Sequence, residues 1–330
     1  MLYVTPLSAG EFCASIEKAL EMAIKEAIDL EECISRIRKT IRGLPEGSLI
    51  VSDQGSRVTF FSVVAGKQRY LSKKDDRIYS LARRRYLTTL LEILMLLKSN
   101  RKSDVIKRKK LIQRLQQFIR VCERGHLEVA RIILTRKQYK WFCGAFRQKE
   151  IDEQEALKTA KGLPVRSKSE KDIINSLDDY AVPLHYEEQL IVFVKPLVEK
   201  LRDSLIKRGD LRGNLYTYHN RQIYWNVPRG LEWMNEVGSI WKTYDARKGT
   251  ITMFNDIKII FADGTLFLQE HEGMMDNFYY RCNASERASI LKYLGVVDKE
   301  HFLETYEHDI DSPEKRKEII EREILPRLWF

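Results

Sequence analysis

Apolar residues recur at helical spacing over the first part of the chain. Between residues 7 and 43 they fall three or four positions apart among Glu and Lys, which predicts helix up to the breaker Leu44-Pro45-Glu46-Gly47. Short β-type runs follow, and two further helices are predicted after them. The runs cover residues 48–51, 58–64 and 68–71, and the helices open at Ser72 and near residue 104.

A helix start is predicted in the segment PVRSKSE, from residue 164 to 170. Ser167 followed three positions later by Glu170 matches a capping box. Glu170 is spaced from Ile173, Ile174 and Leu177 as the first member of one helical stripe, so an acid lies at the start of the core-facing side. The alternative is that Glu170 only caps the helix.

Two apolar β-type runs, residues 253–261 and 265–269, flank the turn Ala262-Asp263-Gly264 and predict a hairpin. If Phe261 faces Thr265, Asp256 lies opposite Glu270, and a one-residue shift would place it beside His271 instead. Side chains alternate along a strand, so Glu270 and Glu272 share a face, as do Asp256 and Lys258. Clustered carboxylates suit Mg²⁺ or Mn²⁺. The alternative is a surface hairpin whose acids are solvated.

The sequence between these two motifs predicts a helix at residues 196–207 and an aromatic hairpin, LYTYHNRQIYWNVP. Aromatic side chains of this hairpin either stack on nucleic-acid bases or pack into a core. They are Tyr216, Tyr218, Tyr224 and Trp225. The tail predicts a strand at residues 302–306 and an amphipathic helix at residues 312–324.

Basic residues are concentrated in the middle of the chain. Residues 57–150 hold 25 Lys and Arg against 7 Asp and Glu, a net charge of +18, although the whole chain carries only +10. This concentration predicts contact with a polyanion, whereas the alternative is a set of solvated helix faces. The candidate nucleic-acid-binding residues are Lys73, Lys74, Arg83, Arg84, Arg85, Lys107, Arg108, Lys109, Lys110 and Arg114.

Other features narrow the class of protein. No apolar run approaches the roughly 20 residues needed to cross a bilayer. The five cysteines are scattered, with no CxxC, which favours free thiols in a reducing cytoplasm over disulfides or zinc. We therefore expect a cytoplasmic protein with no membrane partner.

The motifs VRSKSE and PLHYE, followed by an Asp-bearing strand and EHEGMMD, resemble a bacterial and phage group within the PD-(D/E)XK, restriction-endonuclease-like nuclease superfamily. The segments LPEGSL, YLSKKD and LARRRY resemble the N-terminal region of that group. The resemblance implies that Asp256, Glu270 and Glu170 hold a divalent metal and that His271 belongs to the catalytic signature. It also places a basic residue at Arg287.

The chain departs from the superfamily pattern at three places. Asn255 replaces the proline that precedes the metal-binding aspartate, and Glu272 replaces the lysine expected two residues after Glu270. The role of that lysine, polarising the attacking water, therefore passes to Lys258 or Lys168. Some 65 residues also separate the PLHYE motif from Asp256, which implies an insertion at about residues 190–250.

Together these features predict an α+β protein of two domains. Residues 1–157 would form a basic, mainly helical nucleic-acid-binding domain with a small β-hairpin element. Residues 158–330 would form a restriction-endonuclease-like α/β core, a central mixed sheet flanked by helices, with an inserted helix and hairpin. The predicted function is a Mg²⁺- or Mn²⁺-dependent endonuclease, acting on DNA rather than RNA. The alternative is a degenerate nuclease fold that binds nucleic acid or a protein partner. The oligomeric state is left open.

Overall fold

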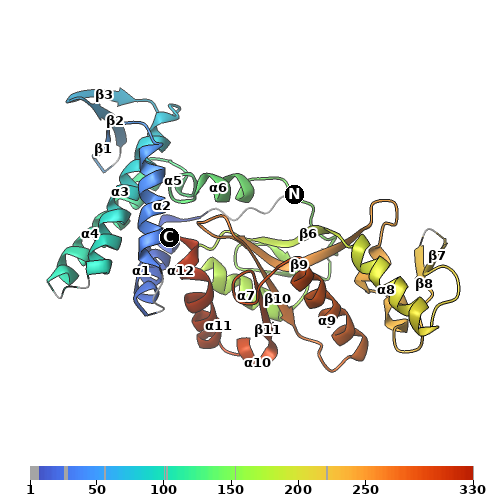
Figure 1. The fold of residues 1–330 in the computed structure, drawn as a ribbon. Coiled ribbons are helices and arrows are strands. Elements are labelled where there is room, and N and C mark those ends of the chain that lie inside the picture. The colour runs from blue at the N-terminus through green and yellow to red at the C-terminus, as the bar shows by residue number, and fades with distance from the viewer. Residues whose placement is uncertain are drawn as a thin grey trace.

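The protein has an α+β fold, as predicted, in which two sets of helices and strands are joined through one shared core (Figure 1). The computed structural model describes residues 7–25, 29–55, 57–99, 101, 103–152, 154–220 and 222–329. Within these residues, no helix is both long and apolar enough to cross a membrane.

The first predicted helical region forms two helices, α1 (Ala9–Lys25) and α2 (Leu30–Arg42). The Asp29 carboxylate caps α2 by accepting hydrogen bonds from the amides of Glu31 and Glu32. The part of the predicted helix at residues 26–28 lies outside the described residues. The helical region predicted as one segment therefore forms two helices, and Asp29 caps the start of the second.

The predicted β-type runs form a three-stranded antiparallel sheet, which is larger than the hairpin element we expected. Its strands are β1 (Ser48–Asp53), β2 (Val58–Val64) and β3 (Lys67–Leu71), in that order. Four helices follow: α3 (Arg77–Ser99), α4 (Asp104–Arg124), α5 (Val129–Ile133) and α6 (Arg136–Phe142).

The C-terminal sheet has the strand order β11-β10-β9-β6 and is mixed. Strands β6 (His185–Phe193), β9 (Thr250–Ile260) and β10 (Leu266–Glu272) are antiparallel neighbours, whereas β11 (Phe302–Tyr306) runs parallel to β10. Helix α7 (Lys168–Asp178) packs on one face and α9 (Phe278–Tyr293) on the other (Figure 1). A two-stranded hairpin, β4 (Leu157–Lys158) with β5 (Pro164–Val165), precedes α7 at the predicted domain boundary.

The register predicted for the β9–β10 hairpin is confirmed. The Phe261 amide donates to the Thr265 carbonyl at 2.9 Å, and the ladder continues from Ile260–Leu266 to Ile257–Gln269. Continuing the same count places Asp256 level with Glu270.

The predicted insertion builds a core of its own against β6, β9 and α9. It contains α8 (Lys195–Arg208), the hairpin β7 (Tyr216–His219) and β8 (Gln222–Trp225), and the 3-10 turns η1 (Glu232–Asn235) and η2 (Ile240–Thr243). Trp225 is buried there, and Tyr216 packs edge-on against it at 5.4 Å. Tyr218 and Tyr224 are exposed, so the hairpin divides its aromatic residues between core and surface.

The end of the chain returns to the first helix (Figure 1). Where one helix was expected at residues 312–324, α10 (Glu307–Ile310) precedes α11 (Pro313–Ile319), a π-helical turn η3 (Ile320–Ile324) and α12 (Leu325–Leu328). The Trp329 ring meets Phe12 edge-on at 5.2 Å, and its indole N–H donates to Ser15 Oγ at 2.7 Å. The core is therefore continuous across the boundary predicted at residue 157.

We expect Trp329→Ala to lower the free energy of unfolding by about 3–5 kcal/mol, because it leaves a large cavity between α1 and α12. Urea denaturation measures this change. Tyr218→Ala is the matched control, since Tyr218 is 59% exposed and its loss should stay within about 0.5 kcal/mol. Equal effects of the two substitutions would show that the C-terminal contact with α1 contributes little.

Candidate metal site

Three carboxylates from separate elements converge inside the C-terminal half of the protein. Glu170 comes from α7, Glu187 from β6 and Asp256 from β9, and each is buried. Each offers an oxygen, and these oxygens all lie within 4.8 Å of one another. We call Glu170, Glu187 and Asp256 the acid triad. It unites two of the three predicted metal ligands with one acid that was not predicted.

Glu170 caps α7 and also belongs to the triad, so the two roles that the sequence left open occur together. The Ser167 hydroxyl accepts from the Glu170 amide at 3.1 Å, and Glu170 Oε2 accepts from the Ser167 amide at 2.9 Å. The same oxygen accepts from the Arg166 amide and from the Tyr186 hydroxyl, at 3.0 and 2.8 Å. These bonds fix one carboxylate oxygen, and the other, Oε1, accepts from Arg166 Nη2 at 3.2 Å.

Glu187 has a left-handed backbone, with φ of 50°, in the middle of strand β6. This conformation costs a non-glycine residue about 1–3 kcal/mol and is found where the surroundings enforce it. The Glu187 carbonyl accepts from the Lys149 amide at 3.1 Å, and the Glu187 side chain is 1% exposed. The Glu187 Oε1 atom contacts the Arg166 guanidinium.

The regular alternation of side chains reverses at this level of the sheet. Met253 packs in the core of the insertion, but Ile257, four residues later, packs with α7 on the opposite face. Between them Asn255 points toward α9, where its amide donates to Glu270 Oε1 at 2.6 Å. Asp256 lies at the reversal and Glu187 at the matching level of β6.

A single guanidinium neutralises part of the triad. Arg166 Nη2 lies 3.2 Å from Glu170 Oε1 and 3.5 Å from Asp256 Oδ1, and it also forms an ion pair with Glu187. Burial disfavours the charged guanidinium, but the charges of Glu187 and Glu170 raise the pKa of Arg166 above its ordinary value. Arg166 is therefore the resident cation of the triad.

Burial raises the pKa of two of the triad carboxylates, Glu187 and Asp256. It raises the pKa of Glu187 to about 7, although Arg166 opposes the shift. Burial also raises the pKa of Asp256, and the negative charge of Glu170 adds to this, whereas a hydrogen bond from the His271 amide at 2.8 Å lowers it. A divalent ion would favour the ionised forms, so metal and protons should compete here.

Glu270, the third predicted metal ligand, is engaged on the α9 side. It forms an ion pair with Arg287 of α9 in addition to its bond with Asn255. Arg287 also lies 3.8 Å from Glu272. Burial raises the pKa of Glu270 well above its usual value, and the Arg287 charge only partly offsets this. A side-chain cation, Arg287, thus contacts Glu270, which was predicted to hold the metal. Glu187, and not Glu270, lies together with Asp256 and Glu170.

The other candidates for catalytic roles are placed as follows. Side-chain alternation predicted that Lys258 lies on the same face as Asp256. In the structure Lys258 pairs with Glu188 at 2.7 Å and does not join the triad. Lys168 is exposed in the first turn of α7. The His271 amide donates to Asp256, while its ring lies 3.1 Å from Glu307 Oε1.

Three of the predicted nucleic-acid-binding arginines bond to backbone carbonyls within the helical half. Arg83 donates to the carbonyls of Ile132 and Leu134, and Arg84 to those of Ile41, Leu44 and Pro45. Arg85 donates to the Leu49 carbonyl at 3.0 Å and lies over the Phe118 ring. The sequence shows a run of arginines on the predicted outer face of a helix. It does not show that these arginines bond to backbone carbonyls of neighbouring segments.

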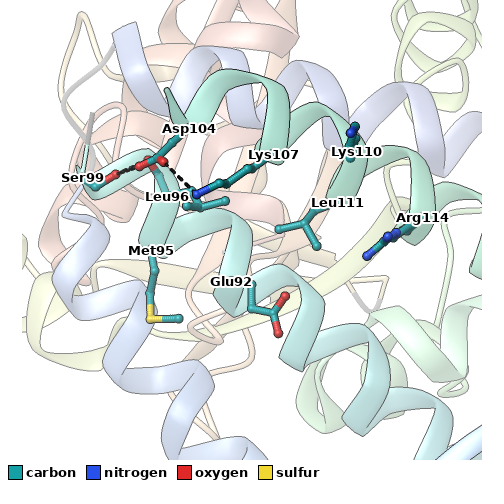
Figure 2. A pocket seen from close by; sticks show the side chains of 9 residues that line it. All are labelled: Glu92, Met95, Leu96, Ser99, Asp104, Lys107, Lys110, Leu111 and Arg114. Atoms are coloured by element: carbon teal, nitrogen blue, oxygen red, sulfur yellow. Dashed lines mark hydrogen bonds and ion pairs between the residues drawn. The ribbon is translucent and has the colours of Figure 1, made fainter. Parts of the chain in front are cut away.

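The basic residues of α4 remain available to a ligand. Lys107, Lys110 and Arg114 line an open groove of about 460 Å³ between α3 and α4, above the apolar side chains of Met95 and Leu96 (Figure 2). Lys73, Lys74 and Lys109 are exposed, and Arg108 is half-buried. Helix α4 lies across α1 and α2 from the C-terminal sheet, so this groove and the acid triad are separate features (Figure 1).

Comparison with protein-family models, with curated proteins and with solved structures found no match to this chain.

Among the triad acids, Glu187 was missed as a ligand although its motif, PLHYE, carried part of the resemblance. Glutamate gives no sign in a sequence that its backbone will be left-handed, because that conformation is typical of Gly and Asn. The usable signal was the position of Glu187 in a β-type run level with Asp256.

We expect Glu187→Gln to stabilise the metal-free protein relative to wild type more strongly as the pH rises. The pKa of Glu187 is raised to about 7 from an ordinary 4.5, so its stability contribution is lost as the pH rises between these values. The difference in unfolding free energy should widen by roughly 3 kcal/mol between pH 4.5 and 8. Urea denaturation in a chelator measures it.

Glu188→Gln provides the matched control on the neighbouring residue. Burial raises the pKa of Glu188, but hydrogen bonds from His185 and Lys258 lower it more, so its pKa lies below the ordinary value. Its substitution should therefore cost a nearly constant stability between pH 4.5 and 8, and the cost should fall only at lower pH, where the carboxylate becomes protonated. A pH-independent effect of Glu187→Gln would contradict the account of the triad given above.

Proposed function

We propose that the protein is a divalent-metal-dependent nuclease that hydrolyses phosphodiester bonds, with DNA as the preferred substrate. The observation that carries this proposal is the acid triad: three buried carboxylates from α7, β6 and β9 that face one another within 4.8 Å. Carboxylate oxygens are the ligands preferred by Mg²⁺ and Mn²⁺. The resemblance of the VRSKSE and EHEGMMD segments to the PD-(D/E)XK superfamily supports the same reading.

The residues of the triad fit a metal by their chemistry. Without metal, the Oε1 atoms of Glu187 and Glu170 both contact the Arg166 guanidinium, so the site already holds a cation among its acids. Asp256 is held in place by the His271 amide. A bound Mg²⁺ or Mn²⁺ would lower the pKa of a coordinated water and stabilise charge on the scissile phosphate.

The protein's own groups supply orientation. The capping box fixes Glu170, the Tyr186 hydroxyl holds the same carboxylate, and Arg287 neutralises the neighbouring Glu270. Of the two lysines considered for orienting the attacking water, Lys168 is the better candidate because Lys258 is paired with Glu188. In this proposal the mixed sheet with α7 and α9 corresponds to a restriction-endonuclease-like core.

The second candidate function is a nucleic-acid-binding or protein-interaction module on a nuclease-like fold without catalysis. The contact between Arg287 and Glu270 favours this second function, because Glu270 already has a side-chain cation as its partner. Glu272 also stands where the superfamily has its lysine. The proposed enzyme requires that Glu187 has taken over from Glu270. Metal-dependent cleavage therefore distinguishes the two functions.

Asp256→Ala should abolish Mg²⁺- or Mn²⁺-dependent cleavage of plasmid and linear DNA, because it removes one of the carboxylates that would hold the metal. Binding of the same DNA without metal should be retained. Asp203→Ala, on the exposed surface of α8, should leave both unchanged. Cleavage by the Asp256 variant at the wild-type rate would remove Asp256 from the site.

Replacing Lys107, Lys110 and Arg114 together with Ala should weaken DNA binding and reduce the slope of log affinity against log salt by up to about 3, because each phosphate contact releases a counterion. Fluorescence anisotropy at several salt concentrations measures this slope. Arg84→Ala should destabilise the fold and leave the slope unchanged, since its guanidinium is bonded to backbone carbonyls. An unchanged slope in the triple variant would exclude the α4 groove as the binding surface.

A further inference from the structure

We propose that Arg166 is a displaceable counter-ion: its guanidinium holds the acid triad together without metal and must leave before a divalent cation can bind. This inference rests on the proposed function, because it takes the triad as the metal site. It assigns to Arg166 a positioning role that sets the metal affinity.

One nitrogen atom of Arg166 occupies the space that a shared metal would need. Its Nη2 lies within 3.5 Å of oxygens from both Glu170 and Asp256 and forms an ion pair with Glu187. A cation that contacts the same three oxygens cannot occupy this volume with the guanidinium, and the two positive charges would repel at such a distance. The two bound states are therefore mutually exclusive.

The exposure of Arg166 allows the exchange. Its side chain is 40% exposed, whereas that of Arg287, the other arginine among buried acids, is only 19% exposed. The Arg166 amide is anchored separately, donating to Glu170 Oε2 and lying 3.2 Å from the Tyr186 hydroxyl. The side chain can consequently swing into solvent while the backbone and the α7 cap stay in place.

The buried carboxylate of Glu187 is the third partner of the same guanidinium. A small divalent cation could bond this carboxylate directly, which favours exchange when the metal is abundant.

The test is the dissociation constant of Mn²⁺ for the full-length protein, measured by calorimetry without nucleic acid. If the guanidinium occupies the triad for about nine-tenths of the time, Arg166→Met should bind Mn²⁺ about tenfold more tightly than wild type. Methionine keeps an unbranched apolar stem and removes the charge. Lys200→Ala removes an exposed positive charge of α8 and should change the constant by less than about twofold.

Arg166→Lys keeps the charge but has one compact donor group, so its dissociation constant should fall between those of wild type and Arg166→Met. A second readout needs no metal binding. In a chelator at pH 8, Arg166→Met should unfold at a lower temperature than Lys200→Ala, because three carboxylates lose their counter-ion. Saturating Mn²⁺ should remove that difference.

The outcomes separate this inference from the proposed nuclease. If wild type binds Mn²⁺ and cleaves DNA, but Arg166→Met binds Mn²⁺ no more tightly than Lys200→Ala, Arg166 is not a displaceable counter-ion and the nuclease stands. If Arg166→Met binds more tightly but neither protein cleaves DNA, the counter-ion role stands and the nuclease fails. If no variant binds Mn²⁺, the metal site and this inference fail together.

Discussion

Buried negative charge is the constraint around which the C-terminal half is organised. An isolated carboxylate is very costly to remove from water, and several in one place are worse, so each group needs a cation or a proton. The protein meets this need twice. Arg166 neutralises Glu170, Glu187 and Asp256 on the α7 side, and Arg287 neutralises Glu270 and Glu272 on the α9 side.

The two arginines differ in a way that assigns different roles to the two acid groups. Arg287 is largely enclosed between α9 and the sheet, so the acids around it have a permanent partner. Arg166 reaches its acids from a more exposed position at the start of α7. Glu270 and Glu272 share Arg287, which holds this acid group in place. Of the two acid groups, the triad therefore has the cation that solvent can reach.

Much of the fold could be predicted from the sequence, because local patterns determine it. The turn at Ala262-Asp263-Gly264 predicted the register of β9 with β10, and the spacing of Ser167 and Glu170 predicted the capping box of α7. The contact of Trp329 with α1 was not predicted, because nothing local links residues more than 300 positions apart. The division of one helical region by Asp29 was also missed, since a single cap residue is a weak signal.

The candidate site could be predicted only in part, for a different physical reason. The roles of Glu170 and Asp256 could be predicted from local patterns and the resemblance. The roles of Glu187 and Arg166 could not, because they depend on a reversal of side-chain direction that departs from regular strand alternation. Strict alternation placed Lys258 beside Asp256, whereas the left-handed backbone at Glu187 and the reversal at Asp256 leave Lys258 with Glu188. The carbonyl partners of the α3 arginines were not predicted for a related reason, because those carbonyls belong to segments distant in sequence.

The separation of the basic groove from the acid triad restricts what kind of ligand could use both. Lys107, Lys110 and Arg114 belong to α4, on the far side of α1 and α2 from the sheet that carries Glu187 and Asp256 (Figure 1). A small phosphorylated molecule cannot contact the two features at once. A polymer with repeating negative charges can contact both features, because each further phosphate that meets a Lys or Arg adds a similar amount of binding free energy. If both features serve one function, the shape of the molecule therefore favours a polynucleotide substrate over a mononucleotide.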